Sequence, residues 1–431
     1  MRASADLLMA ALHSASEELT GKGVRFEVFA RLGESARLSR DALGALERRS
    51  SREFGVGCRV SGGGCAGFGA ASGRGARAGR EAARIALGAM LPSPDPLPPR
   101  SVLGVTGTSL PHDVPDGDQL DAVLADVATR VSGGSHGVKL VQARILAGTS
   151  AAALATGEGF HATATAGGTV MELLVAPPEG PWRHFHFAAP VVSDLDPATI
   201  TERVQETALL ATRGRQPERQ LADVLLAPAV AAPIVEALAR YLTATGDKDR
   251  EVRVSGVWRL TDDRLGPEGL LPLQWDGEGL PARRIELIQR GKVGERLATW
   301  EIAQRIGGRP GGAVRPSYRH PPAAGPANLV VHPAASTPRS TLLSRVASGF
   351  YLAAPAGSVR VDATEGRFGV HAAAVALREG RPVAAHPLVE LRGSFRRLLA
   401  GLLATGGESE SFSLSCAVTT PSLLFHRLEI A

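Results

Sequence analysis

The chain has 431 residues, of which 44% are hydrophobic, 21% charged and only 4% aromatic. A chain of this length buries a large core without disulfide or metal staples, and a single core rarely grows beyond about 250–300 residues, so we expect two or three domains. The 48 basic and 43 acidic residues give a formal net charge of +5. The arginines alternate with acids along the chain, whereas a phosphate-tracking stripe needs clustered basic side chains, so we expect no nucleic-acid partner.

Cysteine content and hydropathy indicate the compartment. Three cysteines, Cys58, Cys65 and Cys416, are too few and odd in number for a secreted disulfide framework. The first fifteen residues have the apolar spacing of an amphipathic helix, not the unbroken apolar run of a signal peptide. The longest apolar stretch, residues 221–242, is interrupted by charged residues and prolines, which is incompatible with a membrane span. We therefore expect a cytoplasmic protein without membrane contacts.

The first half of the chain predicts an α+β domain with a mostly antiparallel sheet. The glycines at residues 62–64 are typical of a hairpin turn. Asp116 or Asp118 can cap one helix, and Asp196 followed by Pro197 is a typical start of another. Strands are expected at residues 25–38, 54–60, 65–71, 139–147, 159–165, 169–176 and 182–188, and helices at 77–90, around 120–131 and at 196–213.

The second half predicts a β-rich, barrel-like domain. Short strands separated by Gly or Pro dominate, and residues 307–326 form a Gly- and Pro-rich loop. A helical stripe from Phe395 is expected to end at Gly406. Strands are expected at residues 283–289, 292–299, 328–332, 349–352, 367–377, 382–391, 411–416 and 422–430, with a short helix at 234–242. The predicted domains are residues 1–220 and 221–431, and the predicted fold class is α+β.

Glycine-rich segments and a histidine pair give only weak signals of chemistry. Gly55-Val56-Gly57 lacks the third glycine and the helix of a dinucleotide fingerprint, so we interpret Gly55 and Gly57 as hairpin glycines that turn the backbone. Residues 307–312 lack the Lys-Ser/Thr ending of a phosphate loop, which leaves them as a candidate flap over a groove. His184 and His186 lie two apart and would share one face of a strand. Such a pair can bind Zn, but no nearby third ligand is evident, and a solvated polar face explains it equally well.

Five stretches spread over most of the chain resemble the motifs of one known family. Residues 54–60 (FGVGCRV) and 67–72 (GFGAAS) resemble its hairpin GIGIRV…GFASTS. Residues 276–291 (DGEGLPARRIELIQRG) resemble its D-x-E-G-x-P-T-R-R…LIE-x-G. Residues 388–395 (LVELRGSF) resemble V-T-I-x-G-N-L, and residues 421–424 match P-S-L-L. In order and spacing, the stretches resemble the TldD/PmbA (TldE) family, whose related subunits form a peptide-processing metallopeptidase.

The departures from the family motifs indicate which subunit type the chain resembles. In the TldD type, a helix carries His-Glu-x-x-x-His, whose imidazoles bind Zn and whose carboxylate activates water. The corresponding helix here is expected at VEALAR, which keeps Glu236 but has Val235 and Arg240 in place of the imidazoles. Cys416 lies near the C-terminal Cys ligand of the TldD type, but a lone thiolate cannot hold Zn, and a strand core residue is the preferred interpretation. The chain therefore resembles the TldE type, with no catalytic or metal-binding residues of its own.

The resemblance implies a heterodimer with a TldD-like catalytic subunit that supplies Zn, the Glu base and water. This chain would shape the chamber in which an extended peptide or a peptide-like natural-product precursor is hydrolysed. Arg283 and Arg284 are weak candidates for substrate binding, because a guanidinium pair can meet peptide carboxylates or carbonyls; a solvated strand face is at least as consistent with them. Residues 311–313 and 361–369 depart from the family's T-G-N and N-P-x-T-G-x-F-S, which suggests a specialised member. The alternatives are a homodimeric peptide-binding or scaffold protein without peptidase activity, and an independent enzyme using the histidine pair.

Overall fold

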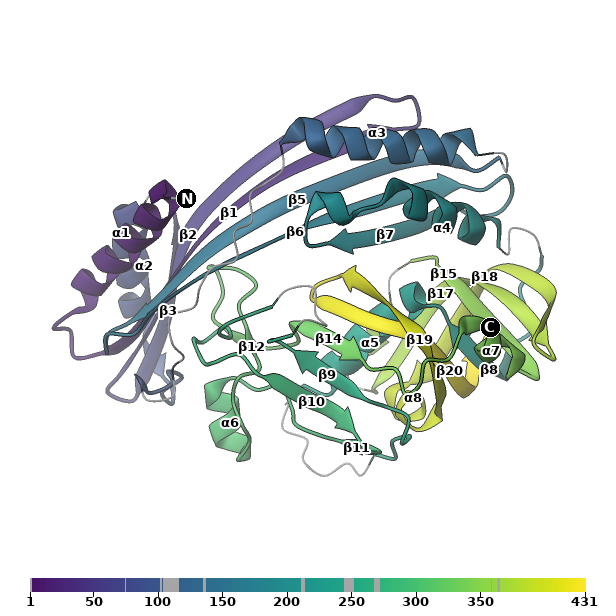
Figure 1. The fold of residues 1–431 in the computed structure, drawn as a ribbon. Coiled ribbons are helices and arrows are strands. Elements are labelled where there is room, and N and C mark those ends of the chain that lie inside the picture. The colour runs from purple at the N-terminus through teal and green to yellow at the C-terminus, as the bar shows by residue number, and fades with distance from the viewer. Residues whose placement is uncertain are drawn as a thin grey trace.

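The computed structural model describes residues 2–73, 75–100, 103, 116–134, 137–210, 214–243, 252–266, 272–357, 359–362 and 365–431. Within these residues, strands from the first half form a seven-stranded antiparallel sheet, and strands from the second half form an eleven-stranded mixed sheet (Figure 1). The predicted α+β class is confirmed. The change from one sheet to the other falls between Ala189 and Gln220. The division into domains at residues 1–220 and 221–431 stays a proposal about independent folding units.

The first sheet has the strand order β4-β3-β2-β1-β5-β6-β7. Its strands are β1 Arg25–Asp41, β2 Leu46–Gly62, β3 Cys65–Ser72, β4 Leu91–Pro92, β5 Lys139–Thr156, β6 His161–Ala176 and β7 Arg183–Ala189. The β2–β3 hairpin forms as predicted, with Gly63 and Gly64 in its turn at φ 59° and 76°. β2 begins at Leu46, before the predicted start at Phe54. The prediction missed residues 47–53 because their side chains are polar and exposed and show no apolar alternation. β6 joins two predicted strands, since residues 166–168 pair with β5 instead of turning.

Four helices cover one face of this sheet, which arches with its other face toward the second half of the chain (Figure 1). They are α1 Arg2–Leu19, α2 Gly75–Gly88, α3 Gly117–Gly133 and α4 Pro197–Leu209. Asp116 and Asp196 cap α3 and α4 with their carboxylates, as predicted. α4 ends at Leu209 in the described part, before the predicted end at Arg213, which lies outside the described residues.

The second sheet has the order β11-β10-β9-β14-β20-β18-β17-β15-β8. Its strands are β8 Gln220–Leu226, β9 Leu260–Asp263, β10 Arg284–Gln289, β11 Lys292–Val293, β14 Asn328–Val331, β15 Ser348–Pro355, β16 Arg360–Asp362, β17 Arg367–Arg378, β18 Arg381–Ser394, β19 Leu402–Ser413 and β20 Ala417–Ile430. Because β8 pairs with both β15 and β20, the strands β20, β18, β17, β15 and β8 close into a ring. The barrel-like character of this half is therefore confirmed. A separate two-stranded hairpin, β12 Ala313–Val314 and β13 Ala323–Ala324, lies in the predicted loop.

The helices of the second half correct two boundaries. These helices are α5 Pro228–Tyr241, α6 Trp300–Ile306, α7 Arg339–Ser344 and α8 Phe395–Gly401. α5 begins six residues before the predicted start at Ile234, with Pro228 in its first turn, where a missing N–H is tolerated. The predicted end of the last helix at Gly406 is wrong, because α8 ends at Gly401 and Gly406 lies inside β19. Leu402 is buried in the same core as Leu398, so the apolar spacing continues although the helix does not.

Candidate functional site

A cavity of about 1130 Å³ lies between the first sheet and the second half of the chain. One side consists of the ends of β5, β6 and β7 together with α4, and the opposite side consists of α5, β15 and β19. Its volume exceeds the about 300–1,000 Å³ of typical small-molecule sites. We call it the intersheet cavity and treat it as the candidate functional site.

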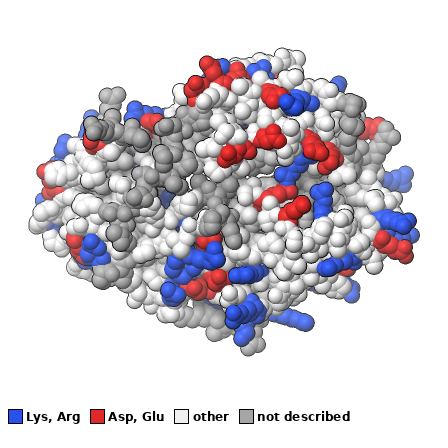
Figure 2. All heavy atoms as spheres, viewed as in Figure 1, with Lys and Arg blue, Asp and Glu red and all other residues white. Residues whose placement is uncertain are grey.

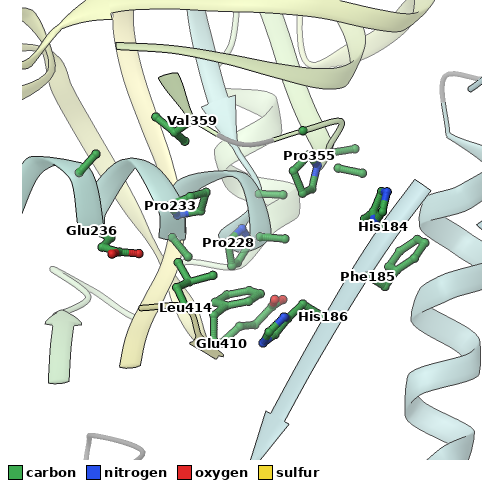
Figure 3. A pocket seen from close by; sticks show the side chains of 18 of the residues that line it. His184, Phe185, His186, Pro228, Pro233, Glu236, Pro355, Val359, Glu410 and Leu414 are labelled. Atoms are coloured by element: carbon green, nitrogen blue, oxygen red, sulfur yellow. The ribbon is translucent and has the colours of Figure 1, made fainter. Parts of the chain in front are cut away.

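The histidine pair of β7 lies in this cavity. His184 and His186 project from one side of β7 into it, and Phe185, which also lines the cavity, points to the other side of the strand (Figure 3). Phe185 packs against the core beneath α3 and α4. His186 is paired in register with Glu172 of β6, which also lines the cavity. The two imidazoles therefore share one face of β7, as predicted, and this face forms part of the cavity wall.

The electrostatics of His186 favour a neutral ring. Its Nε2 atom is buried and has no hydrogen-bond partner among the residues that the structure describes. Burial lowers the pKa of His186 below its ordinary value, against the opposing charge of Glu172. No three His, Cys, Asp or Glu side chains among the described residues come together in a way that could hold a metal ion. His186 thus offers a neutral hydrogen-bonding group, and the histidine pair has no third metal ligand beside it within the described part of the chain.

The opposite wall is one face of α5. Its cavity-lining residues repeat at helical spacing and are mostly small or apolar: Pro228, Ala229, Ala232, Pro233, Glu236, Ala237, Arg240 and Tyr241. Val235 is only 1% exposed and belongs to the core, so it does not line the cavity. Of the three positions compared with His-Glu-x-x-x-His, only Glu236 and Arg240 face the site. α5 contains no His or Cys, so it offers no imidazole or thiolate ligand in any register of the comparison.

Glu236 and Arg240 are engaged with each other. Arg240 Nε donates to Glu236 Oε1 at 3.0 Å, and Ser415 Oγ both donates to Glu236 and accepts from Arg240. The adjacent Cys416 is buried, and burial together with the charge of Glu236 raises the pKa of its thiol well above the ordinary value. Cys416 is therefore a protonated core residue, which agrees with the preferred interpretation of its position.

The motif residues that carry the family resemblance lie elsewhere, in a buried contact between the two halves. Arg59 of β2 donates to Glu27 of β1 and, at 3.0 Å, to Glu278. Arg315 also donates to Glu27, and the amide of Trp300 donates to the other oxygen of Glu278 at 2.6 Å. All four charged side chains are at most 5% exposed. The stretches FGVGCRV and DGEGLPARR thus touch each other, and their charges hold the two halves together.

The charges of this cluster have shifted pKa values. Burial raises the pKa of Glu278 to about 6, against the lowering effect of Arg59. Burial also favours neutral Glu27, but Arg315 and Arg59 outweigh it and hold its pKa below the ordinary value. Glu27 therefore stays ionised, whereas Glu278 takes up a proton in mildly acidic solution.

The glycines of FGVGCRV serve packing. A Cβ at Gly55 would lie 2.2 Å from ring atoms of Tyr318, and one at Gly57 would lie 2.4 Å from the Tyr318 carbonyl oxygen. Tyr318 comes from the predicted Gly- and Pro-rich loop, which lies against β2 here. The interpretation of Gly55 and Gly57 as hairpin glycines that turn the backbone is corrected: they let another segment approach a straight strand.

Arg283 and Arg284 do not line the intersheet cavity. Arg283 forms an ion pair with Glu295 at 2.8 Å and donates to the Pro310 carbonyl, while Arg284 pairs with Asp263 at 2.7 Å. Their substrate-binding role stays a prediction. The contact with Pro310 holds the glycine-rich segment 307–312 against β10.

Other lining residues gave no sequence signal. Glu172, Arg203, Glu410, Phe412 and Leu414 all line the cavity but come from β6, α4 and the β19 region. Arg203 and Glu410 form an ion pair across the cavity. No local motif marks such residues, because the fold alone brings them together. On the face shown in Figure 2, acidic and basic side chains are intermixed.

Comparisons with known proteins agree with this architecture. Residues 218–431 match the model of the PmbA/TldA metallopeptidase C-terminal domain. The fold is similar to that of TldE from Thermococcus kodakarensis, with a TM-score of 0.79 and 15% identity over 97% of this chain and 98% of that chain. It is equally similar to a proposed DNA gyrase modulator from Thermotoga maritima, with a TM-score of 0.79 and 15% identity over 98% and 100% of the two chains. A protein from Bacteroides thetaiotaomicron that is described in the same way has a TM-score of 0.77 and 16% identity over 100% of this chain and 99% of that chain.

An arched helix-covered sheet facing a β-rich half across a cavity defines a metallopeptidase-type fold. Residues 218–431 thus belong to the TldD/PmbA family, and the chain as a whole shares the fold of TldE. No curated protein matches its sequence significantly. Among the described residues, no helix is both long and apolar enough to span a membrane.

Proposed function

We propose that this chain is the non-metal, TldE-like subunit of a heterodimeric zinc metallopeptidase. A TldD-like partner supplies Zn, the Glu base and water, and this chain shapes the chamber in which an extended peptide or peptide-like natural-product precursor is hydrolysed in the cytoplasm. The peptide backbone adds to the complex in extended form, so that main-chain hydrogen bonds hold it. The carrying observation is the cavity face of α5, which presents prolines, alanines and one Glu–Arg pair.

This donor set does not fit a catalytic zinc. Such a site needs three protein ligands, usually His with Glu or Cys, plus an open position for water. On α5 only Glu236 has a ligating side chain that faces the cavity. Its Oε1 atom accepts a hydrogen bond from Arg240 Nε at 3.0 Å. A guanidinium next to this carboxylate also repels a divalent cation. The family membership supports a metallopeptidase assembly, and the α5 face supports a subunit that leaves the metal to its partner.

The proposal is tested by co-expression with a homologue that carries His-Glu-x-x-x-His. We expect a stable 1:1 complex with peptidase activity that neither chain has alone. Glu236→Gln in this chain is expected to leave the activity of the complex within about twofold, because the residue touches no reacting atom, whereas the equivalent change in the partner abolishes activity. Failure to form a complex with any such homologue, or loss of activity on Glu236→Gln, contradicts the proposal.

A further inference from the structure

The intersheet cavity has an apolar wall beside the α5 face. Figure 3 shows Leu414, from the β19 region, near Pro228 and Pro233 of α5. Phe412 and Val359 line the same cavity and add further apolar surface. Leu414 is partly buried and packs against the core of the second half. Removing such a wall from water gains roughly 25 cal/mol per Å². A ligand that fills this part of the cavity therefore gains most from an apolar group.

Six of the arginines and glutamates that line the cavity are paired with one another. Arginines and glutamates line the cavity in nearly equal number. Arg203 is paired with Glu410, Arg240 with Glu236, and Arg144 lies 3.9 Å from Glu172. A charged ligand would have to compete with these pairs and lose its own hydration. The lining consequently favours a ligand segment without charged side chains.

The side formed by β7 matches an amide group. A neutral imidazole carries one donor and one acceptor, as does each peptide unit. His186 Nε2 is buried and finds no partner in the described part of the chain, so it is desolvated there without a compensating hydrogen bond. An incoming backbone N–H or C=O supplies that partner, whereas a purely hydrocarbon ligand leaves it unsatisfied.

We propose that the intersheet cavity binds an uncharged, extended peptide segment, whose bulky apolar side chain packs against Phe412 and Leu414 while His186 hydrogen-bonds its backbone. The inference deepens the proposed function and rests on it for the choice of a peptide ligand. It adds that this subunit itself selects the substrate by an apolar side chain. The volume of about 1130 Å³ accommodates more than one small molecule, as a peptide segment requires.

Binding to the purified chain alone tests the inference. The probes are fluorescein-labelled octapeptides of Gly, Ser and Ala with blocked ends, whose two central residues are Leu-Phe, Ser-Ser, Lys-Lys or Glu-Glu, followed by fluorescence anisotropy. We expect the Leu-Phe probe to bind at least roughly tenfold more tightly than the others, since each tenfold step needs only about 1.4 kcal/mol. Equal binding of all four probes, or no binding at millimolar concentration, overturns the inference.

Matched variants locate the site. Ala229→Phe fills the cavity from α5, Leu414→Asp places a charge in the apolar wall, and both are expected to weaken Leu-Phe binding at least roughly tenfold. Leu403→Asp is the control, because Leu403 lies on β19, is 49% exposed and does not line the cavity. Unchanged binding by both cavity variants, with unfolding midpoints close to wild type, overturns the inference. If Ala229→Phe does not fold, Leu414→Asp decides.

The histidine is tested separately. His186→Ala is expected to weaken binding roughly fivefold, the net value of one hydrogen bond, and His161→Ala, an exposed change on β6 outside the cavity, to leave it unchanged. Equal affinities of the two variants remove His186 from the inference. A chain that forms an active complex but binds no peptide alone refutes this inference and leaves the proposed function standing; the reverse result refutes only the proposed function.

Discussion

At the scale of single residues, the buried contact of Arg59 with Glu27 and Glu278 carries the strongest expectation for stability. Arg59→Ala leaves Glu278 buried without a guanidinium and leaves Glu27 with Arg315 as its basic partner, and breaking a buried pair typically costs about 3–5 kcal/mol. Arg52→Ala on the same strand is the control, because its ion pair with Glu34 is largely exposed and is worth less than about 1 kcal/mol. Urea unfolding of both variants measures the difference. Equal losses for the two changes would contradict the role of the buried cluster.

The raised pKa of Glu278 predicts a pH dependence. The pKa of Glu278 is about 6 in the folded chain, whereas its ordinary value is 4.5. The carboxyl therefore binds its proton more tightly in the folded chain than in the unfolded chain. Its stabilising contribution is therefore fully present below pH 4.5 and is lost as pH rises through about 6. One and a half pKa units correspond to about 2 kcal/mol.

Glu278→Gln removes this titration. The difference in unfolding free energy between wild type and variant should therefore change by about 2 kcal/mol between pH 4.5 and pH 7, with wild type losing relative stability as pH rises. Urea unfolding at several pH values within the range where both proteins fold measures it. A difference that is constant with pH, or one that moves in favour of wild type, shows that Glu278 titrates normally.

At the scale of elements, Gly57 explains why β2 and the loop that carries Tyr318 approach so closely. Gly57→Ala places a Cβ 2.4 Å from a backbone oxygen, which cannot rotate away as a side chain can. We expect a loss of about 1–3 kcal/mol, seen as a lower midpoint of thermal unfolding. Gly33→Ala on the neighbouring strand β1 is the control, since no atom lies within 4 Å of its added Cβ. An unchanged midpoint for Gly57→Ala would mean that the loop does not dock on β2.

Boundaries marked by a local sequence pattern were predicted correctly at α3 and α4, whereas boundaries that depend on pairing with a distant segment were missed at β2 and α8. The caps at Asp116 and Asp196 are local chemistry, and both helices begin where predicted. β2 was underestimated because residues 46–53 pair through their backbone while their side chains stay in water. The end of α8 was missed because Leu402 is buried in a strand at a position that also fits the helical stripe. Pairing between distant segments leaves little trace in the pattern of one segment.

At the scale of the whole molecule, the family resemblance and the candidate site occupy different places. The quoted motifs FGVGCRV and DGEGLPARR meet in the buried contact around Arg59, which positions the arched sheet over the second half. The intersheet cavity is built from β6, β7, α5 and β19, which carry few of those motif residues. The sequence therefore predicted the architecture through the residues that hold it together. It could not predict the cavity lining, because only the completed fold brings Glu410, Leu414 and His186 to one place.

The division of labour proposed for the two subunits predicts the metal content of the complex. We expect one zinc per heterodimer and no stoichiometric zinc in this chain alone, because α5 offers no imidazole and Cys416 is buried. Cys416→Ser should leave zinc content and peptidase activity unchanged and lower stability modestly, since a hydroxyl replaces a protonated thiol in the core. Elemental analysis by mass spectrometry of the purified complex and of each chain counts the metal. Two zinc ions per heterodimer, or loss of zinc on Cys416→Ser, would assign a metal site to this chain and contradict the proposed division.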